Sequence, residues 1–182
     1  EYFVPMENRD IAYVGEHIQI GNHRVILDSR TLAKMLDAVD VTDSELVLDV
    51  GSGYGYSAAI IAHLAEAVVA LESEDKPANE MQNALIDHGI DNVIVERGPL
   101  FCGAESHAPY DVIFVQGGVE LMPDEILTQL KEGGRIVAIF MQGSLGSVKI
   151  GYKLNNEISW RFAFNAGAPV LDGYKKEMTF TF

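Results

Sequence analysis

The sequence predicts an α/β fold in which a doubly wound, mostly parallel sheet is followed by a C-terminal antiparallel hairpin. Short runs rich in valine, isoleucine and leucine alternate with longer segments that have helical spacing, and a glycine-rich turn joins the first of these strands to its helix. Continuous apolar strands that alternate with helices are typical of parallel, Rossmann-like sheets with helices on both faces. Because 182 residues are enough for one full core and short for two, we expect a single domain over residues 1–182.

The expected elements follow in chain order. We expect helices over residues 31–39, 57–65, 76–89 and 123–134, and strands over 46–50, 67–72, 92–98, 111–118 and 135–141. The first helix has Leu32, Met35, Leu36 and Val39 at helical spacing. The third has Pro77 in its first turn and Gly89 as its terminator.

The remaining elements are justified in the same way. The fourth helix begins with Pro123 and two acids and is followed by two glycines, which is the usual asymmetry of helix ends. Residues 147–154 and 158–165 alternate apolar and polar side chains around the turn Asn-Asn-Glu, so they predict a hairpin.

Composition and charge narrow the range of partners. The chain has 13 basic and 27 acidic residues, and its net charge of −14 repels nucleic acid and anionic membranes. We therefore expect neither as a partner. No apolar run approaches the ~20 residues that a membrane span needs, and the first residues lack the layout of a signal peptide. One cysteine, Cys102, and histidines without ligand spacing predict no disulfide, no metal site and a cytoplasmic location.

The turn after the first strand is the strongest functional signal. Gly51, Gly53 and Gly55 follow Asp49 at the carboxyl edge of the predicted sheet, where ligands bind in this architecture. Glycines there admit positive φ and allow a ligand close to the backbone near a helix N-terminus. Glu72 ends the second strand 21 positions after Gly51, where a carboxylate accepts hydrogen bonds from ribose hydroxyls. The alternative interpretations are that the glycines form only a tight structural turn and that Glu72 is only a solvated charge at a strand end.

The segment "LDVGSGYG" resembles motif I of the class I S-adenosylmethionine-dependent methyltransferases. Seven segments also resemble, in order and spacing, the protein-L-isoaspartate O-methyltransferases, and this similarity covers nearly the whole chain. They are "FVP", "AYVG", "IQIGNHRVI", "VLDVGSGYGYSAAIIA", "NVIVERG", "YDVIFVQGG" and "LKEGGRIV". That family normally has a further helical segment before "FVP", and the chain opens without a methionine, so we expect a natural N-terminal segment to precede residue 1.

The resemblance implies a cofactor, a substrate and a set of binding residues. The cofactor is S-adenosyl-L-methionine, and the substrate is a protein or peptide whose isoaspartyl residue carries a free carboxylate. The expected cofactor-binding residues are Asp49, Gly51, Ser52, Gly53, Tyr54, Glu72, Gly98 and Gln116.

Two segments depart from the family pattern. Leu27 and Ser29 stand where the family has a serine and a proline, so Asp28 and Ser29 become the candidate catalytic residues after a shift of the loop, with His23 just before it. Pro99 replaces an aspartate that contacts the adenine side, and proline offers neither a side-chain acceptor nor an N–H donor. We expect weak turnover on an isoaspartyl peptide, with adenine held through backbone and apolar contacts.

Two other classes of function remain open at this point. A cofactor-binding regulator, or a catalytically silent homologue that binds partners through the same cleft, would have the same glycine turn. A nicotinamide-dependent oxidoreductase is the third interpretation, but the spacing of the glycines differs from G-x-G-x-x-G.

Overall fold

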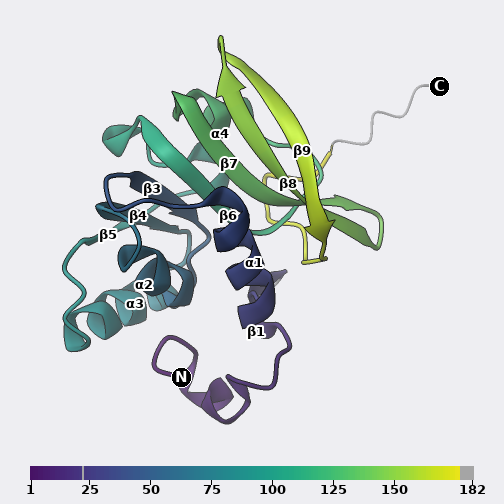
Figure 1. Ribbon diagram of the computed structural model, residues 1–182. Coiled ribbons are helices and arrows are strands. Elements are labelled where there is room, and N and C mark those ends of the chain that lie inside the picture. The colour runs from purple at the N-terminus through teal and green to yellow at the C-terminus, as the bar shows by residue number, and fades with distance from the viewer. Residues whose placement is uncertain (22, 177–182) are drawn as a thin grey trace.

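A mixed sheet forms the centre of the protein in a computed structural model that describes residues 1–21 and 23–176 (Figure 1). Its strand order is β5-β4-β3-β6-β7-β8-β9. The first five strands in this order are parallel, and β8 and β9 complete the sheet as an antiparallel hairpin. The strands are β3 (Leu46–Val50), β4 (Ala67–Glu72), β5 (Val93–Arg97), β6 (Tyr110–Val119), β7 (Leu130–Gln142), β8 (Leu145–Leu154) and β9 (Glu157–Asn165). The predicted sheet and its C-terminal hairpin are confirmed.

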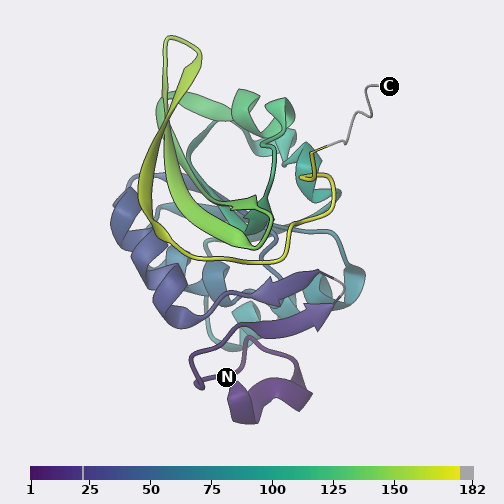
Figure 2. The ribbon, with the colours of Figure 1, turned by 90° about the vertical axis from the view of Figure 1, so that its right-hand side faces the viewer.

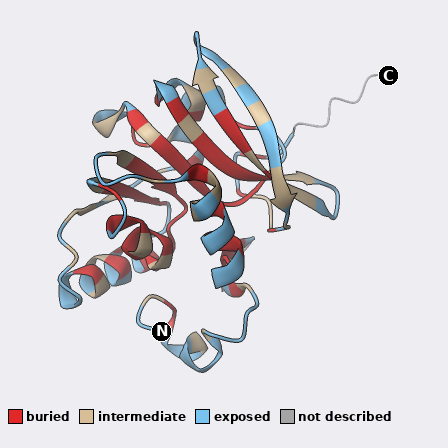
Figure 3. Cartoon of the chain, viewed as in Figure 1, coloured by how far each residue is buried: buried red, intermediate tan, exposed pale blue. Residues whose placement is uncertain are grey.

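The sheet separates two hydrophobic cores, because successive strand residues point to opposite faces. On one face, Met35, Ile61 and Met81 are buried, and they come from three different helices. These helices are α1 (Ser29–Val39), α2 (Tyr56–Ala62) and α3 (Asp75–Asp87). The other face is covered by Ile126 of α4 (Asp124–Thr128) and by loop residues such as Tyr174. Figure 3 shows that buried residues dominate the central strands.

The predicted helix over 123–134 is wrong in its second half. Helix α4 ends at Thr128, and β7 begins at Leu130. The buried side chain of Leu130 and the hydrogen bond from Tyr110 N to Gln129 O bring this segment beside β6. Gly133 has φ +81° and lies at a register shift between β6 and β7. The two glycines therefore form an irregularity within a strand, not the end of a helix.

A small antiparallel ribbon and a 3-10 helix precede α1, and neither was expected. The 3-10 helix spans Met6–Ile11, and the ribbon pairs β1 (Ile18–Gly21) with β2 (Arg24–Ile26). Ile18 and Ile26 pack with Tyr54 from the glycine turn. In Figure 2 the ribbon lies between the 3-10 helix and the body of the molecule. It thereby brings β2 close to the turn where a ligand is expected.

Candidate functional site

The glycine turn between β3 and α2 needs glycine at each of its three positions. Gly51, Gly53 and Gly55 have φ values of +82°, +58° and +91°. A β-carbon would lie 2.8 Å from Ile20 Cδ1 if built on Gly53, and 2.7 Å from Met81 Cγ if built on Gly55. Side chains are therefore disfavoured here by backbone conformation, and at the last two positions by space as well.

Asp49 anchors this turn from inside the protein. Its Oδ2 accepts hydrogen bonds from Ser52 Oγ at 2.7 Å and Ser57 Oγ at 2.5 Å, and its Oδ1 accepts one from Gln116 Nε2 at 2.7 Å. Asp49 is fully buried, and this burial raises its pKa despite the three hydrogen bonds. The structure thus brings together Asp49, Ser52 and Gln116, as expected from strand ends that share one edge.

Glu72 ends β4 beside the same turn, and its carboxylate is fully buried. Backbone amides of Gly53, Ser73 and Glu74 donate to it at 2.7, 2.7 and 3.0 Å. Arg24 Nη1 donates to Oε1 at 2.9 Å, and Nη2 donates to Oε2 at 2.7 Å. Burial alone would raise the pKa of Glu72, but Arg24 and the amides hold it below its ordinary value.

Arg24 is the site residue that sequence reasoning missed. It lies in β2 and is only 6% exposed, although arginine is rarely buried without a partner. The available signal was a single arginine directly before the apolar run Val25-Ile26-Leu27. Such a position predicts a buried arginine with an acidic partner, but it does not identify the partner.

Two pockets lie near this ion pair. One is lined by Leu27, Gly51, Ser52 and Gln116, among others. The second has a volume of about 350 Å³ and is lined by Arg24, Ser73, Glu74, Pro99, Leu100, Phe101 and Asp172. Its volume lies within the range of small-molecule sites. Gly98 precedes this lining, and its N–H donates to Glu72 O at 3.1 Å.

Tyr54 has a buried side chain that packs against Val4, Ile18 and Ile26. The structure therefore gives Tyr54 an apolar packing role in the ribbon. Its expected role in covering a ligand stays a prediction.

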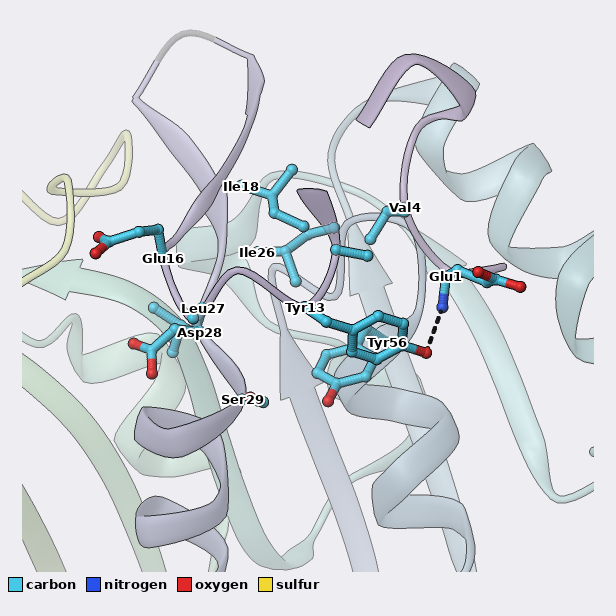
Figure 4. Close-up of a pocket in the computed structure, with 12 residues that line it drawn as sticks. Glu1, Val4, Tyr13, Glu16, Ile18, Ile26, Leu27, Asp28, Ser29 and Tyr56 are labelled. Atoms are coloured by element: carbon cyan, nitrogen blue, oxygen red, sulfur yellow. Dashed lines mark hydrogen bonds between the residues drawn. The ribbon is translucent and has the colours of Figure 1, made fainter. Parts of the chain in front are cut away.

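The candidate catalytic residues lie at the start of α1, with Asp28 in the loop before it and Ser29 as its first residue (Figure 4). Asp28 caps α1, because its Oδ1 accepts hydrogen bonds from Arg30 N at 3.1 Å and Thr31 N at 3.0 Å. Its own N–H donates to His17 Nδ1 at 2.9 Å, so His17 carries its proton on Nε2 and donates to Gly167 O at 2.8 Å. His17, not His23, therefore supports this loop.

A third, small pocket separates this loop from the N-terminal segment. In Figure 4 the carboxylates of Glu16 and Asp28 lie on one side, and the rings of Tyr13 and Tyr56 lie on the other. Ser29 lines the pocket at the first residue of α1. Leu27 also lines it, but it is only 4% exposed and belongs to the core beneath.

Residues 1–21 and 23–176 contain neither a candidate membrane span nor a candidate metal site. No helix there is long and apolar enough to cross a membrane. No group of three or more histidine, cysteine, aspartate or glutamate side chains in the same part of the chain is placed to hold a metal ion.

Comparison with known proteins gives consistent matches. The family model "Protein-L-isoaspartate(D-aspartate) O-methyltransferase (PCMT)" matches residues 1–159. Protein-L-isoaspartate O-methyltransferase 2 of Anaeromyxobacter sp. is 38% identical over 82% of this chain and 61% of its own length. The protein of the same name from Polaromonas sp. is 38% identical over 74% of this chain and 64% of its own length. The chain thus spans about three fifths of these relatives.

Solved structures give a similar result. A protein-L-isoaspartate O-methyltransferase superimposes with a TM-score of 0.78 at 25% identity, covering 87% of this chain and 52% of the other. A Plasmodium falciparum protein described as a beta-aspartate methyltransferase (PCMT), in complex with S-adenosyl-L-homocysteine, also has a TM-score of 0.78. It is 18% identical over 94% of this chain and 84% of its own, and at that identity it supports the fold alone.

Proposed function

The chain belongs to the protein-L-isoaspartate(D-aspartate) O-methyltransferase family, and from this premise we propose that it transfers a methyl group from S-adenosylmethionine to a carboxylate of isoaspartyl residues in proteins. One observation carries the proposal beyond family membership. The glycine turn, the Asp49 network and Glu72 meet at one edge of the sheet, beside a pocket of about 350 Å³.

The residues at this edge fit the proposed cofactor. Gly51 and Gly53 put no side chain of their own between the turn and a ligand, Glu72 lies where ribose hydroxyls need an acceptor, and Pro99 and Leu100 offer apolar contacts to adenine. The cofactor can use Glu72 only if Arg24 moves, because Arg24 donates hydrogen bonds to both oxygens of Glu72. When bound, S-adenosylmethionine supplies a methyl group activated by a sulfonium.

The remaining task of the protein is to position the acceptor. A carboxylate is already nucleophilic, so the chain needs only to orient it and exclude water. The side chain of Leu27 cannot donate a hydrogen bond to the acceptor, and the lining of the small pocket contains no lysine or arginine among the described residues. The lining contains the acidic residues Glu1, Glu16 and Asp28, which disfavour the entry of a further carboxylate, so this pocket favours slow transfer to isoaspartate.

The test is radiolabelled methyl transfer to an isoaspartyl peptide, run beside its normal aspartyl counterpart. We expect weak turnover of the isoaspartyl peptide only, because a lost positioning contact of ~1–3 kcal/mol slows transfer by roughly one to two powers of ten. A Leu27→Ser, Ser29→Pro double variant should recover part of the rate. Proline suits position 29, the first residue of α1.

Two outcomes would count against parts of the proposal. Robust turnover by the unmodified protein would mean that Asp28 or Ser29 already supplies the contact. Methyl transfer to neither peptide, by either protein, combined with tight binding of S-adenosylhomocysteine would favour the second candidate, a cofactor-binding regulator or silent homologue. The buried position of Leu27 is the observation that keeps this candidate open.

The same proposal covers the chain's partners and location. We expect a protein or peptide substrate and no nucleic acid, since net charge −14 disfavours polyanions. We also expect a cytoplasmic site of action, because a single cysteine fits a reducing compartment. Calorimetry with NAD as the control ligand separates this function from that of a nicotinamide-dependent enzyme.

A further inference from the structure

We propose that Arg24 is an internal competitor of the cofactor, which occupies the ribose acceptor Glu72 and must move away before a nucleoside binds. The inference rests on the proposed function, since it concerns the same cofactor site. In this proposal, Arg24 sets how tightly the cofactor binds.

The first step is the saturation of Glu72. Both carboxylate oxygens accept a hydrogen bond from Arg24, at 2.9 and 2.7 Å, and three backbone amides take further acceptor positions. A carboxylate has about four lone-pair sites. A ribose diol that binds Glu72 therefore has to replace the guanidinium.

The second step is the position of the guanidinium. A β-carbon on Gly51 would lie 3.6 Å from Arg24 Nη2, so Arg24 stands directly over the turn. Gly51 lines one pocket and Arg24 lines the larger one. The guanidinium thus separates two spaces that a nucleoside with an amino-acid tail would have to join.

The third step is that Arg24 has alternative partners. Glu74 and Asp172 line the larger pocket together with Arg24, and both residues are exposed. A swing toward them keeps the arginine beside a carboxylate. Glu72 meanwhile retains its three amides, so a ligand need replace only the two bonds from Arg24.

The closed arrangement is also imperfect. Arg24 Nε is buried and has no hydrogen-bond partner among the residues that the structure describes. An unpaired buried donor weakens the state that contains it. The closed pair is therefore suited to exchange with an open one.

The test is calorimetry of S-adenosylhomocysteine binding to the unmodified protein, to Arg24→Gln and to Arg161→Gln. Arg161 is exposed on β9, and its replacement removes the same charge far from the site. If the open state is populated at about one part in ten, Arg24→Gln should bind about tenfold more tightly, because apparent affinity scales with the competent fraction. Arg161→Gln should match the unmodified protein.

A second measurement needs no variant. The Nε–H signal of Arg24, followed by nitrogen-resolved NMR in the unmodified protein, should shift and exchange faster with solvent when S-adenosylhomocysteine is added to saturation. An Arg24 signal that stays unchanged in the complex would overturn the proposal even if Arg24→Gln failed to fold.

The outcomes separate this inference from the proposed function. Tight binding by the unmodified protein, with equal or weaker binding by a folded Arg24→Gln, would overturn the role of Arg24 and leave the methyltransferase proposal standing. Absence of binding by both proteins would overturn both. Circular dichroism on each variant establishes that it is folded.

Discussion

At the scale of single residues, the carboxylate of Glu72 has a structural role and a proposed functional role. It ties β4 to the glycine turn through Gly53 and to β2 through Arg24. It also occupies the position at which the family resemblance implies a ribose acceptor. Under the proposed function the two roles compete, because a nucleoside and the guanidinium would need the same oxygens.

The ion pair should give a measurable pH dependence. The folded-state pKa of Glu72 lies below its ordinary value of 4.5, so the charged form is stabilised by folding. Its contribution is present above about pH 4.5 and is lost as the pH falls through the lower folded-state pKa. Chemical denaturation of Glu72→Gln from pH 3 to 7 should show a shallower acid loss than the unmodified protein. At pH 7 the variant should be less stable by roughly 3–5 kcal/mol, because Arg24 loses its partner.

The matched control is Glu74→Gln, which removes an exposed carboxylate two residues away. Its pH profile should follow that of the unmodified protein. Parallel profiles for Glu72→Gln and the unmodified protein would contradict the proposed link between Arg24 and Glu72.

The sequence predicted the acidic half of this site but not the basic half. Asp49, Glu72 and Gln116 could be placed together because parallel strands end at the same edge of a sheet. Arg24 lies 48 residues before Glu72 in the chain, and no local pattern indicates which distant acid a buried arginine will meet. The ribbon that carries Arg24 has only three or four residues per strand, too few for a reliable period.

At the scale of elements, tertiary contacts determine where a helix ends when local sequence patterns do not. Residues 123–134 have helix signals at both ends, but Leu130 is needed in the core and Lys131 pairs with Asp111 at 2.7 Å. Pairing with β6 therefore ended α4 early. The helix over 31–39 was predicted correctly because its apolar stripe faces the core throughout.

The N-terminus of α1 provides a test of whether Asp28 is a cap or also a catalytic residue. Asp28→Ala removes two hydrogen bonds to the first turn and should lower the free energy of unfolding by about 1 kcal/mol. Asparagine caps helices as well as aspartate does, so Asp28→Asn should keep the stability. Urea denaturation and methyl transfer, measured on both variants, separate the roles. If Asp28→Asn keeps stability but loses turnover, Asp28 has a chemical role beyond capping.

At the scale of the whole molecule, one sheet is shared by two cores that different helices cover. Val47 and Leu48 are adjacent in β3, yet their side chains belong to opposite cores. Neither core can lose its packing without exposing strands that the other core needs. We therefore propose that the described part of the chain unfolds as one domain.

This proposal predicts one transition with coincident probes. Met81 of α3 and Ile126 of α4 are both fully buried, on opposite faces of the sheet. Met81→Ala and Ile126→Ala should each lower the free energy of unfolding by about 2–5 kcal/mol, because each leaves a cavity. Fluorescence of Trp160 in β9, which contacts Phe140 at 4.6 Å between ring centroids, should change together with far-ultraviolet circular dichroism in all three proteins. If Met81→Ala shifted the dichroism transition and left that of Trp160 in place, the two cores would be unfolding independently. We expect instead that both signals shift together, because β3 and β6 contribute side chains to both cores. A state with only one core folded would therefore be much less stable than the native state.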